Sequence, residues 1–340
     1  MRQCAMVRLG RILWVAGMAA LLARTVPAAS PELRSLDVYT SKDPQLAVQL
    51  ELAIEKGYFR EEGLDVAVKY LSGGGEIPPA MAAGSIKVAI AAHNNALNLI
   101  SRDFPMKVIA TVNDISGAMG IAVRNSLNVR SPKDLEGKKL GTFVYGGTMD
   151  FLAKMAARHG VNRGKIQVIN LQPPDLAPTF ARGDIDAALI WEPHLTRTAK
   201  QGGTVVLTGS RANFPEKKET YHLWGWPAVV FTAQDFINKN PNTLVALLKG
   251  LARGDDFVQS NRAEAVKILS RKLSIPEVEL TEMMGRSNYT MLMNQALLDQ
   301  LNSLADSLLA MKEIPKAPRA STYVVPHLMQ KARPEWVSVK

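Results

Sequence analysis

The sequence predicts an α/β protein that folds into two lobes. Its 340 residues exceed what one hydrophobic core usually organises. Short β-branched runs alternate with helical stretches over most of the chain, a pattern typical of sheets covered by helices. No Pro/Gly/Ser-rich linker divides the chain, so we expect ordered segments to cross between the lobes more than once, with a functional cleft between them.

Nine short apolar segments, each bounded by turn residues, are predicted strands. They are residues 36–39, 64–70, 88–90, 107–112, 120–123, 139–143, 167–170, 187–190 and 228–231. Helices are expected to end near five glycines, because glycine takes the left-handed conformation at little cost: Gly57, Gly63, Gly84, Gly160 and Gly183. Ser131 and Pro132 predict a helix start, and helical periodicity dominates residues 234–311.

The N-terminus predicts an export signal. Three arginines precede an apolar run over residues 12–23, and small residues follow it. The run is too short for a membrane-spanning helix, which needs about 20 residues. We expect a signal peptide over residues 1–29, cleaved between Val26 and Pro31, and a periplasmic mature protein; the alternative is an uncleaved anchor.

Charge and cysteine content exclude several classes of function. The formal net charge of +10 falls to +6 when the four arginines before residue 30 are removed. The other basic residues are dispersed, so we expect no nucleic-acid partner. Cys4 is the single cysteine and lies in the predicted signal, which leaves the mature chain without thiolate chemistry or a disulfide. Five scattered histidines form no His-x-x-x-His pair, and we expect neither a metal nor a cofactor.

Three groups of segments carry a family resemblance. They are residues 53–59 with 62–66, residues 134–141, and residues 183–188 with Trp191-Glu192-Pro193. In their order and spacing they resemble the sulfonate/nitrate/taurine group of ABC-transporter substrate-binding proteins, a family that also includes binders of thiamine-precursor pyrimidines. Each segment also has a purely structural explanation as a helix end or a capped turn, so the resemblance indicates a fold better than a ligand.

The resemblance implies a type II periplasmic binding fold, with two lobes joined by two crossing segments. Lobe I would comprise residues 30–115 plus 226–340, and lobe II residues 116–225. It further implies a monomeric receptor, not an enzyme, that delivers a small anionic or zwitterionic solute to the membrane permease of an ABC importer. A sulfonate or taurine is the first expectation. The alternatives are nitrate or bicarbonate, a pyrimidine or aromatic acid, and an exported sensor or partner-binding protein on the same fold.

Candidate ligand-binding residues follow from the position of the loops. In open α/β sheets, ligands bind outside the carboxyl ends of the strands, where helix N-termini direct N–H groups at the cleft. The loops after the first three predicted strands contribute Ser41, Gln45, Gly73, Gly74, His93 and Asn94. Each has a structural alternative as a turn residue or a satisfied polar residue at a strand end.

Three further loops complete the predicted site. Gly146, Gly147 and Thr148 allow a backbone to approach an anion, and Thr148 adds a hydroxyl at a helix start, although a plain capped turn needs the same residues. Trp191 is expected to cover the apolar part of the solute. Glu192 is expected to pair with a ligand ammonium group or, alternatively, to cap the following helix. Asp114, at the first crossing between the lobes, has the same two possible roles, contact with the ligand or a purely structural one.

Enzymatic function is a poor second hypothesis. A pyrimidine synthase of the related type depends on a cysteine-rich motif that this chain lacks, and no Gly-x-Ser-x-Gly or His-Glu-x-x-His motif is present. The sequence therefore favours a receptor that closes on its ligand.

Overall fold

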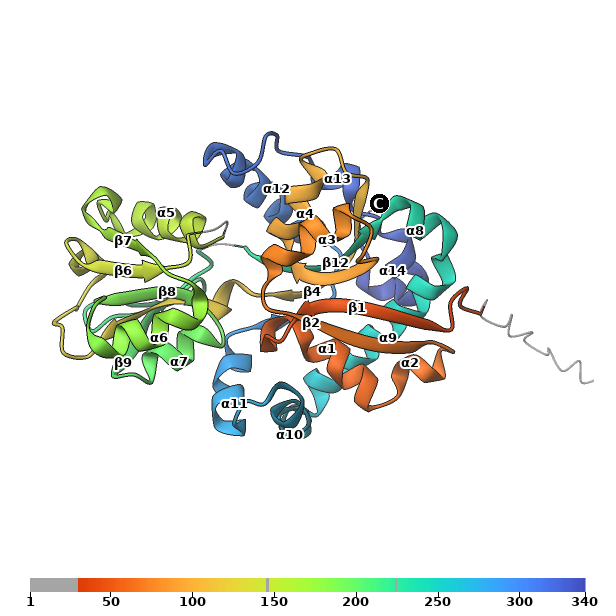
Figure 1. Ribbon diagram of the computed structural model, residues 1–340, viewed down its shortest axis with the longest axis horizontal. Helices are drawn as coiled ribbons and strands as arrows, with labels where there is room; N and C mark the ends of the chain where they lie inside the picture. Colours follow the sequence, from red (N-terminus) through yellow and green to blue (C-terminus); the bar gives the residue numbers. More distant parts are fainter. Residues whose placement is uncertain (1–29, 145–146, 224, 340) are drawn as a thin grey trace, which may run out of the picture.

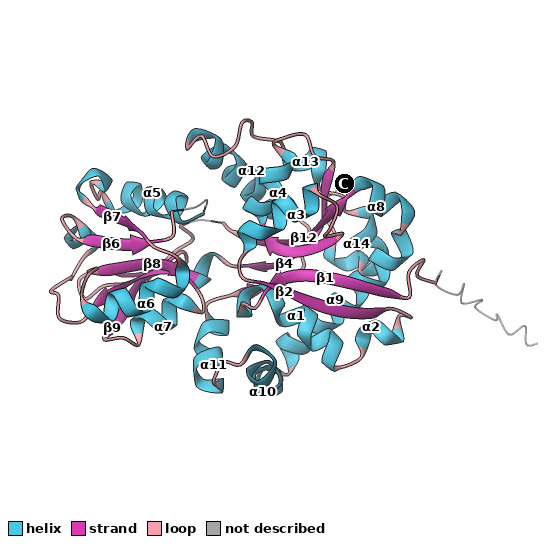
Figure 2. Ribbon diagram, viewed as in Figure 1, coloured by secondary structure: helices cyan, strands magenta, loops and turns pink. Residues whose placement is uncertain are grey.

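The computed structural model describes residues 30–144, 147–223 and 225–339, and within these ranges the chain forms two lobes, each built on its own β-sheet (Figures 1 and 2). We call them the first lobe, whose sheet contains β1–β4, β12 and β13, and the second lobe, whose sheet contains β5–β11. This architecture confirms the predicted two-lobed α/β fold. The predicted signal peptide lies outside the described residues.

The sheet of the first lobe has the order β13-β4-β12-β3-β1-β2. Its strands are β1 Ser35–Ser41, β2 Asp65–Leu71, β3 Val88–Ala92, β4 Met106–Asp114, β12 Pro227–Ala233 and β13 Asn288–Tyr289. β1 pairs in parallel with β2 and β3, whereas β12 lies antiparallel between β3 and β4. Every residue of β3 is buried, as its uninterrupted apolar sequence predicts for a strand covered on both faces.

The sheet of the second lobe has the order β11-β10-β9-β5-β8-β6-β7. Its strands are β5 Met119–Arg124, β6 Lys139–Thr142, β7 Gln167–Asn170, β8 Ala187–Trp191, β9 Gly203–Thr208, β10 Arg211–Asn213 and β11 Lys218–Thr220. β6 lies parallel between β7 and β8, and β5 lies antiparallel between β8 and β9. All nine predicted strands are confirmed, while β9, β10, β11 and β13 were not predicted.

Helices cover both sheets. They are α1 Pro44–Glu55, α2 Tyr58–Glu61, α3 Ile77–Ala82, α4 His93–Ile100, α5 Gly147–His159, α6 Pro173–Arg182, α7 His194–Ala199, α8 Gln234–Lys239, α9 Pro241–Ser260, α10 Arg262–Leu273, α11 Glu277–Gly285, α12 Gln295–Ala310, α13 Ala320–Tyr323 and α14 His327–Ala332. All five glycines predicted near helix ends have φ between 65° and 84°, in the left-handed region that favours glycine. Ser131 and Asp134 form a capping box on a 3₁₀ helix over Pro132–Leu135.

Two glycines on α9 allow this helix to pack closely against α1 and α2. A Cβ atom at Gly250 would overlap the ring of Phe59 on α2, and one at Gly254 would overlap the backbone carbonyl of Gln49 on α1. The side of the first lobe that carries these helices is therefore closely fitted, with little room for larger side chains.

The chain passes from the first lobe to the second after β4 and returns before β12. The predicted boundaries at residues 115/116 and 225/226 are consistent with this order and stay a prediction. Helix α11 belongs to the C-terminal part of the chain but lies beside the second lobe (Figure 1). In the part of the chain that the structure describes, no helix combines the length and the apolar character needed to cross a membrane.

Candidate functional site

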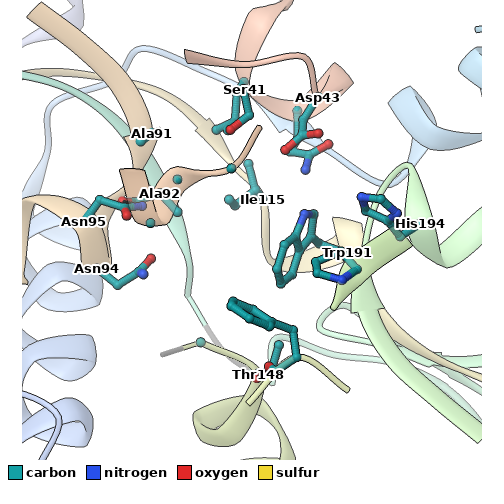
Figure 3. Close-up of a pocket in the computed structure, with 18 of the residues that line it drawn as sticks. Ser41, Asp43, Ala91, Ala92, Asn94, Asn95, Ile115, Thr148, Trp191 and His194 are labelled. Atoms are coloured by element: carbon teal, nitrogen blue, oxygen red, sulfur yellow. Dashed lines mark hydrogen bonds between the residues drawn. The ribbon is translucent and has the colours of Figure 1, made fainter. Parts of the chain in front are cut away.

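A cleft of about 550 Å³ lies between the two lobes (Figure 3). The first lobe contributes the loop after β1, the glycine-rich loop after β2, the start of α4 and Trp226, and the second lobe contributes the ends of β6 and β8 and the starts of α5, α6 and α7. The lining residues used below are Ser41, Asp43, Gln45, Gly73, Gly74, Glu76, Asn94, Asn95, Phe143, Gly147, Thr148, Trp191, His194 and Trp226. The carboxyl ends of strands from both sheets thus meet at one space, as expected for open α/β sheets.

Eight of the predicted site residues line this cleft. They are Ser41, Gln45, Gly73, Gly74, Asn94, Gly147, Thr148 and Trp191. Gly146 lies outside the described residues, so its expected contact stays a prediction. The hydroxyl of Thr148 donates a hydrogen bond of 2.6 Å to the carbonyl oxygen of Phe143, which ties the start of α5 to the end of β6.

Aromatic rings form the wall on the side of the second lobe. Trp191 contacts Phe143 edge-to-face with ring centroids 6.1 Å apart, and it contacts His194 in the same way at 6.4 Å. Burial lowers the pKa of His194 to about 4, and the nearby Arg197 contributes to this shift, so the imidazole is neutral near pH 7. Across the cleft, Trp226 donates from its indole nitrogen to Asn94 Oδ1 at 3.2 Å.

Two amides of the first lobe have orientations fixed by hydrogen bonds. Gln45 donates from Nε2 to the carbonyl oxygen of Glu192 at 2.8 Å, across the boundary between the lobes, and Asn95 donates from Nδ2 to the carbonyl oxygen of Ala92 at 3.0 Å. A carbonyl oxygen can only accept a hydrogen bond, so the amide atom that faces it must be the N–H donor, and these bonds identify each amide nitrogen. Gln45 Oε1 and Asn95 Oδ1 are left buried without a hydrogen-bond partner in the described part of the chain.

Comparison with known proteins identifies the family. The model of the family described as NMT1/THI5 like matches residues 48–265, well over half of the chain. The chain belongs to this family. The taurine-binding periplasmic protein of Escherichia coli is 25% identical over 260 residues, covering 74% of this chain and 76% of that protein.

Solved structures support the fold. The alkanesulfonate-binding protein SsuA of Xanthomonas axonopodis, bound to MOPS, has a TM-score of 0.70 at 18% identity, covering 88% of this chain and 100% of that one. The desulfurization enzyme DSZB has a TM-score of 0.64 at 12% identity, covering 89% and 99%. At such identities the likeness extends to the fold alone, and it includes both binding proteins and an enzyme.

In this NMT1/THI5-like chain, Glu192 does not line the cleft. Its side chain is fully buried and caps α7, accepting from the backbone nitrogen of Thr196 at 3.0 Å and from the Thr196 hydroxyl at 2.9 Å. Arg286, which follows α11, donates to the same carboxylate and to the Thr196 hydroxyl at 2.7 Å. The expected position beside a ligand ammonium is therefore wrong, and the capping alternative describes the residue.

Two ion pairs near Glu192 connect the second lobe to the C-terminal part of the chain. Burial raises the pKa of Glu192, while Arg286 and the hydrogen bonds from Thr196 oppose the rise. A second ion pair, between Lys200 and Glu279 at 2.6 Å, links α7 to α11 nearby. The two pairs connect the second lobe to a helix that follows β12 in the chain.

His93 and Asp114 also lie away from the cleft. His93 is the first residue of α4, and its side chain is buried, with Nε2 3.0 Å from the hydroxyl of Tyr323 and the two rings stacked 5.7 Å apart. Burial lowers the pKa of His93 to about 3, so it is neutral. Asp114 accepts from the backbone nitrogen of Ser116 at 3.0 Å and lines a separate pocket of about 180 Å³.

Several residues that line the cleft were not predicted from the sequence. Asn95 follows the predicted Asn94, Phe143 ends the predicted strand over residues 139–143, and His194 follows Trp191 by three positions. Asp43 stands between the predicted Ser41 and Gln45 in the loop after the first strand, but it was not predicted as a site residue. Among the described residues, no group of three or more His, Cys, Asp or Glu side chains is arranged to hold a metal ion.

Proposed function

We propose that this protein is the solute-binding component of an ABC importer, acting in the periplasm as a monomer and delivering its solute to a membrane permease. The solute is small and anionic or zwitterionic, with taurine-like compounds and alkanesulfonates as the first candidates. The observation that carries the proposal is a cleft lined from both lobes, at the starts of α4 and α5, in a member of a family with taurine-binding and sulfonate-binding relatives. A ligand that contacts both lobes would favour the closed form over the open one.

The acid group of the solute would bind at the start of α5. Gly147 and Thr148 begin this helix of 13 residues and line the cleft. The N-terminal end of a helix presents unpaired N–H groups and a partial positive charge, which stabilise an anion. The Thr148 hydroxyl would orient this end through its bond to Phe143 instead of donating to the solute.

The size and walls of the cleft favour an organic solute over an inorganic anion. A space of about 550 Å³ with Phe143, Trp191 and Trp226 in its walls exceeds what nitrate or bicarbonate fills. Catalysis is disfavoured because, in the described part of the chain, no lining hydroxyl hydrogen bonds to His194, the one imidazole in the lining. A pyrimidine or an aromatic acid remains the second candidate, favoured by the aromatic wall.

The proposal also includes the extents of the signal peptide and of the two lobes. The signal peptide would cover residues 1–29, lobe I residues 30–115 plus 226–340, and lobe II residues 116–225. The order of the sheets supports the two crossings that these boundaries require.

A thermal-shift and calorimetry panel tests the function. The mature protein is titrated with taurine, ethanesulfonate, nitrate, bicarbonate and an aminopyrimidine. We expect saturable binding of a sulfonate, and a ligand at 100 times its dissociation constant adds about 2.7 kcal/mol to the free energy of unfolding. Binding of nitrate alone, or of no organic anion, would overturn the proposed solute class.

A further inference from the structure

The carboxylate of Asp43 lies at the cleft without a partner among the described residues. Asp43 precedes α1 and its side chain makes no cap hydrogen bond there. Among the described residues its carboxylate accepts no hydrogen bond and joins no ion pair, and Arg197, the cation that acts on it electrostatically, is exposed and outside ion-pair distance. A half-buried, unpaired carboxylate at a binding site is stabilised by a ligand that places a positively charged or N–H-bearing group beside it.

In the described part of the chain, the buried side-chain polar atoms of this lining that lack a hydrogen-bond partner are also acceptors. They are Gln45 Oε1 and Asn95 Oδ1, and Glu76 adds a second carboxylate at an exposed position. No lysine or arginine is among the residues that line the cleft in the described ranges. A plain anion would meet two carboxylates and no cationic side chain, which disfavours it.

An aromatic surface separates Asp43 from the start of α5. In Figure 3 the indole of Trp191 is drawn between Asp43 and Thr148, with His194 beside it. Phe143 extends the same wall through its edge contact with Trp191. A solute with one polar group at each end would therefore place its middle against rings, which favours an apolar or planar body.

We infer that the solute is a zwitterion whose ammonium group pairs with Asp43 and whose acid group binds at the start of α5, with a ring-sized apolar body between them against Trp191. This inference rests on the proposed function and narrows it from anions in general to ammonium-bearing acids. It also replaces Glu192 by Asp43 as the residue that binds the cation, because Arg286 already pairs with Glu192.

The pH dependence of binding follows from the groups around Asp43. Burial raises the pKa of Asp43 to about 7, and Arg197 partly opposes the rise, while the facing His194 is neutral. An ammonium ligand needs the carboxylate ionised. Its affinity therefore rises as the pH increases from 6 to 8, whereas the affinity of an amine-free sulfonate does not rise.

Matched ligand pairs test the inference by calorimetry at pH 7.5. The pairs are 4-(aminomethyl)benzenesulfonate with 4-methylbenzenesulfonate, and taurine with ethanesulfonate. We expect the ammonium member of each pair to bind at least tenfold more tightly, and the ring-bearing zwitterion to bind more tightly than taurine. Asp43→Asn should remove the preference for the ammonium member, while the matched control Asp65→Asn, at the exposed start of β2 and outside the cleft lining, should retain it.

The outcomes separate the two proposals. Equal affinities within each pair, or an Asp43→Asn variant that weakens both members equally, would overturn the zwitterion inference and leave the sulfonate receptor intact. Failure of all four ligands to bind would overturn the proposed solute class itself. Asp43→Asn should fold, because the side chain makes no cap bond; an unchanged or raised unfolding temperature confirms that lost ammonium preference reflects binding.

Discussion

Replacing Arg286 by methionine should destabilise the protein by about 3 kcal/mol. The change removes three hydrogen bonds, to the Glu192 carboxylate, the Thr196 hydroxyl and the exposed Glu282 carboxylate, and it leaves the fully buried Glu192 carboxylate without its cation. Breaking a buried pair on one side costs about 3 to 5 kcal/mol, and the lower end applies because Thr196 still donates two hydrogen bonds to Glu192. Methionine retains much of the apolar volume of the arginine stem.

A double-mutant cycle isolates the pair. We measure the free energy of unfolding by urea denaturation for Arg286→Met, Glu192→Gln and the double variant at pH 7. The double variant should recover at least half of the loss, because a neutral glutamine needs no cation. As a control, Arg319→Met removes an exposed pair with Asp306 and should cost no more than about 1 kcal/mol.

Removal of Arg286 should also change how the free energy of unfolding depends on pH. Without Arg286 the pKa of Glu192 rises further above its value in the unfolded chain, so folding binds an additional proton. The stability of Arg286→Met therefore falls more steeply than that of the wild type as the pH increases from 5 to 8. A loss no larger than that of Arg319→Met, or one independent of pH, would refute the buried-pair account.

Three further predictions concern the cleft, the helix packing and the lobes. Trp191→Ala should weaken the bound sulfonate at least tenfold, about 1.4 kcal/mol, because the solute loses its ring contact; calorimetry measures this, and unchanged affinity would count against the aromatic wall. Gly250→Ala should lower the free energy of unfolding by about 1 to 3 kcal/mol, because the added methyl group overlaps Phe59 and this outweighs the higher helix propensity of alanine. As a control, Gly285→Ala should not lower the free energy of unfolding, because no atom lies within contact of the added methyl group. Small-angle scattering should show compaction at saturating ligand, and an unchanged radius of gyration would speak against closure.

The fold was largely predictable because its strands are apolar runs with clear turn residues. Every predicted strand exists, and the helix-end glycines adopt the expected conformation. The strands that were missed are mostly two or three residues long, and such short pairings leave little periodic signal in a sequence. Their position is decided by neighbouring strands instead of by their own composition.

The site was predictable as a set of loops, but not as a set of side chains. Trp191 and Thr148 line the cleft because strand ends determine where their loops lie. Glu192 was misplaced because a carboxylate after a strand looks the same whether it faces the cleft or caps the next helix. The deciding partner is Arg286, 94 residues away in sequence.

His93 shows the same difficulty. Its ring turns inward to meet Tyr323, 230 residues later, and no local pattern reveals such a partner. Asp43 was overlooked for the opposite reason, because its carboxylate has no partner among the residues that the structure describes, and a sequence does not show such an absence.

The most direct test is a crystal structure of the mature protein with 4-(aminomethyl)benzenesulfonate. The account predicts the ligand in the cleft between the lobes, its sulfonate at the start of α5 near Gly147, its ring against Trp191 and its ammonium within hydrogen-bond distance of the Asp43 carboxylate. A ligand bound outside this cleft, or one lying in it with its ammonium group remote from Asp43 and its sulfonate away from α5, would contradict the account.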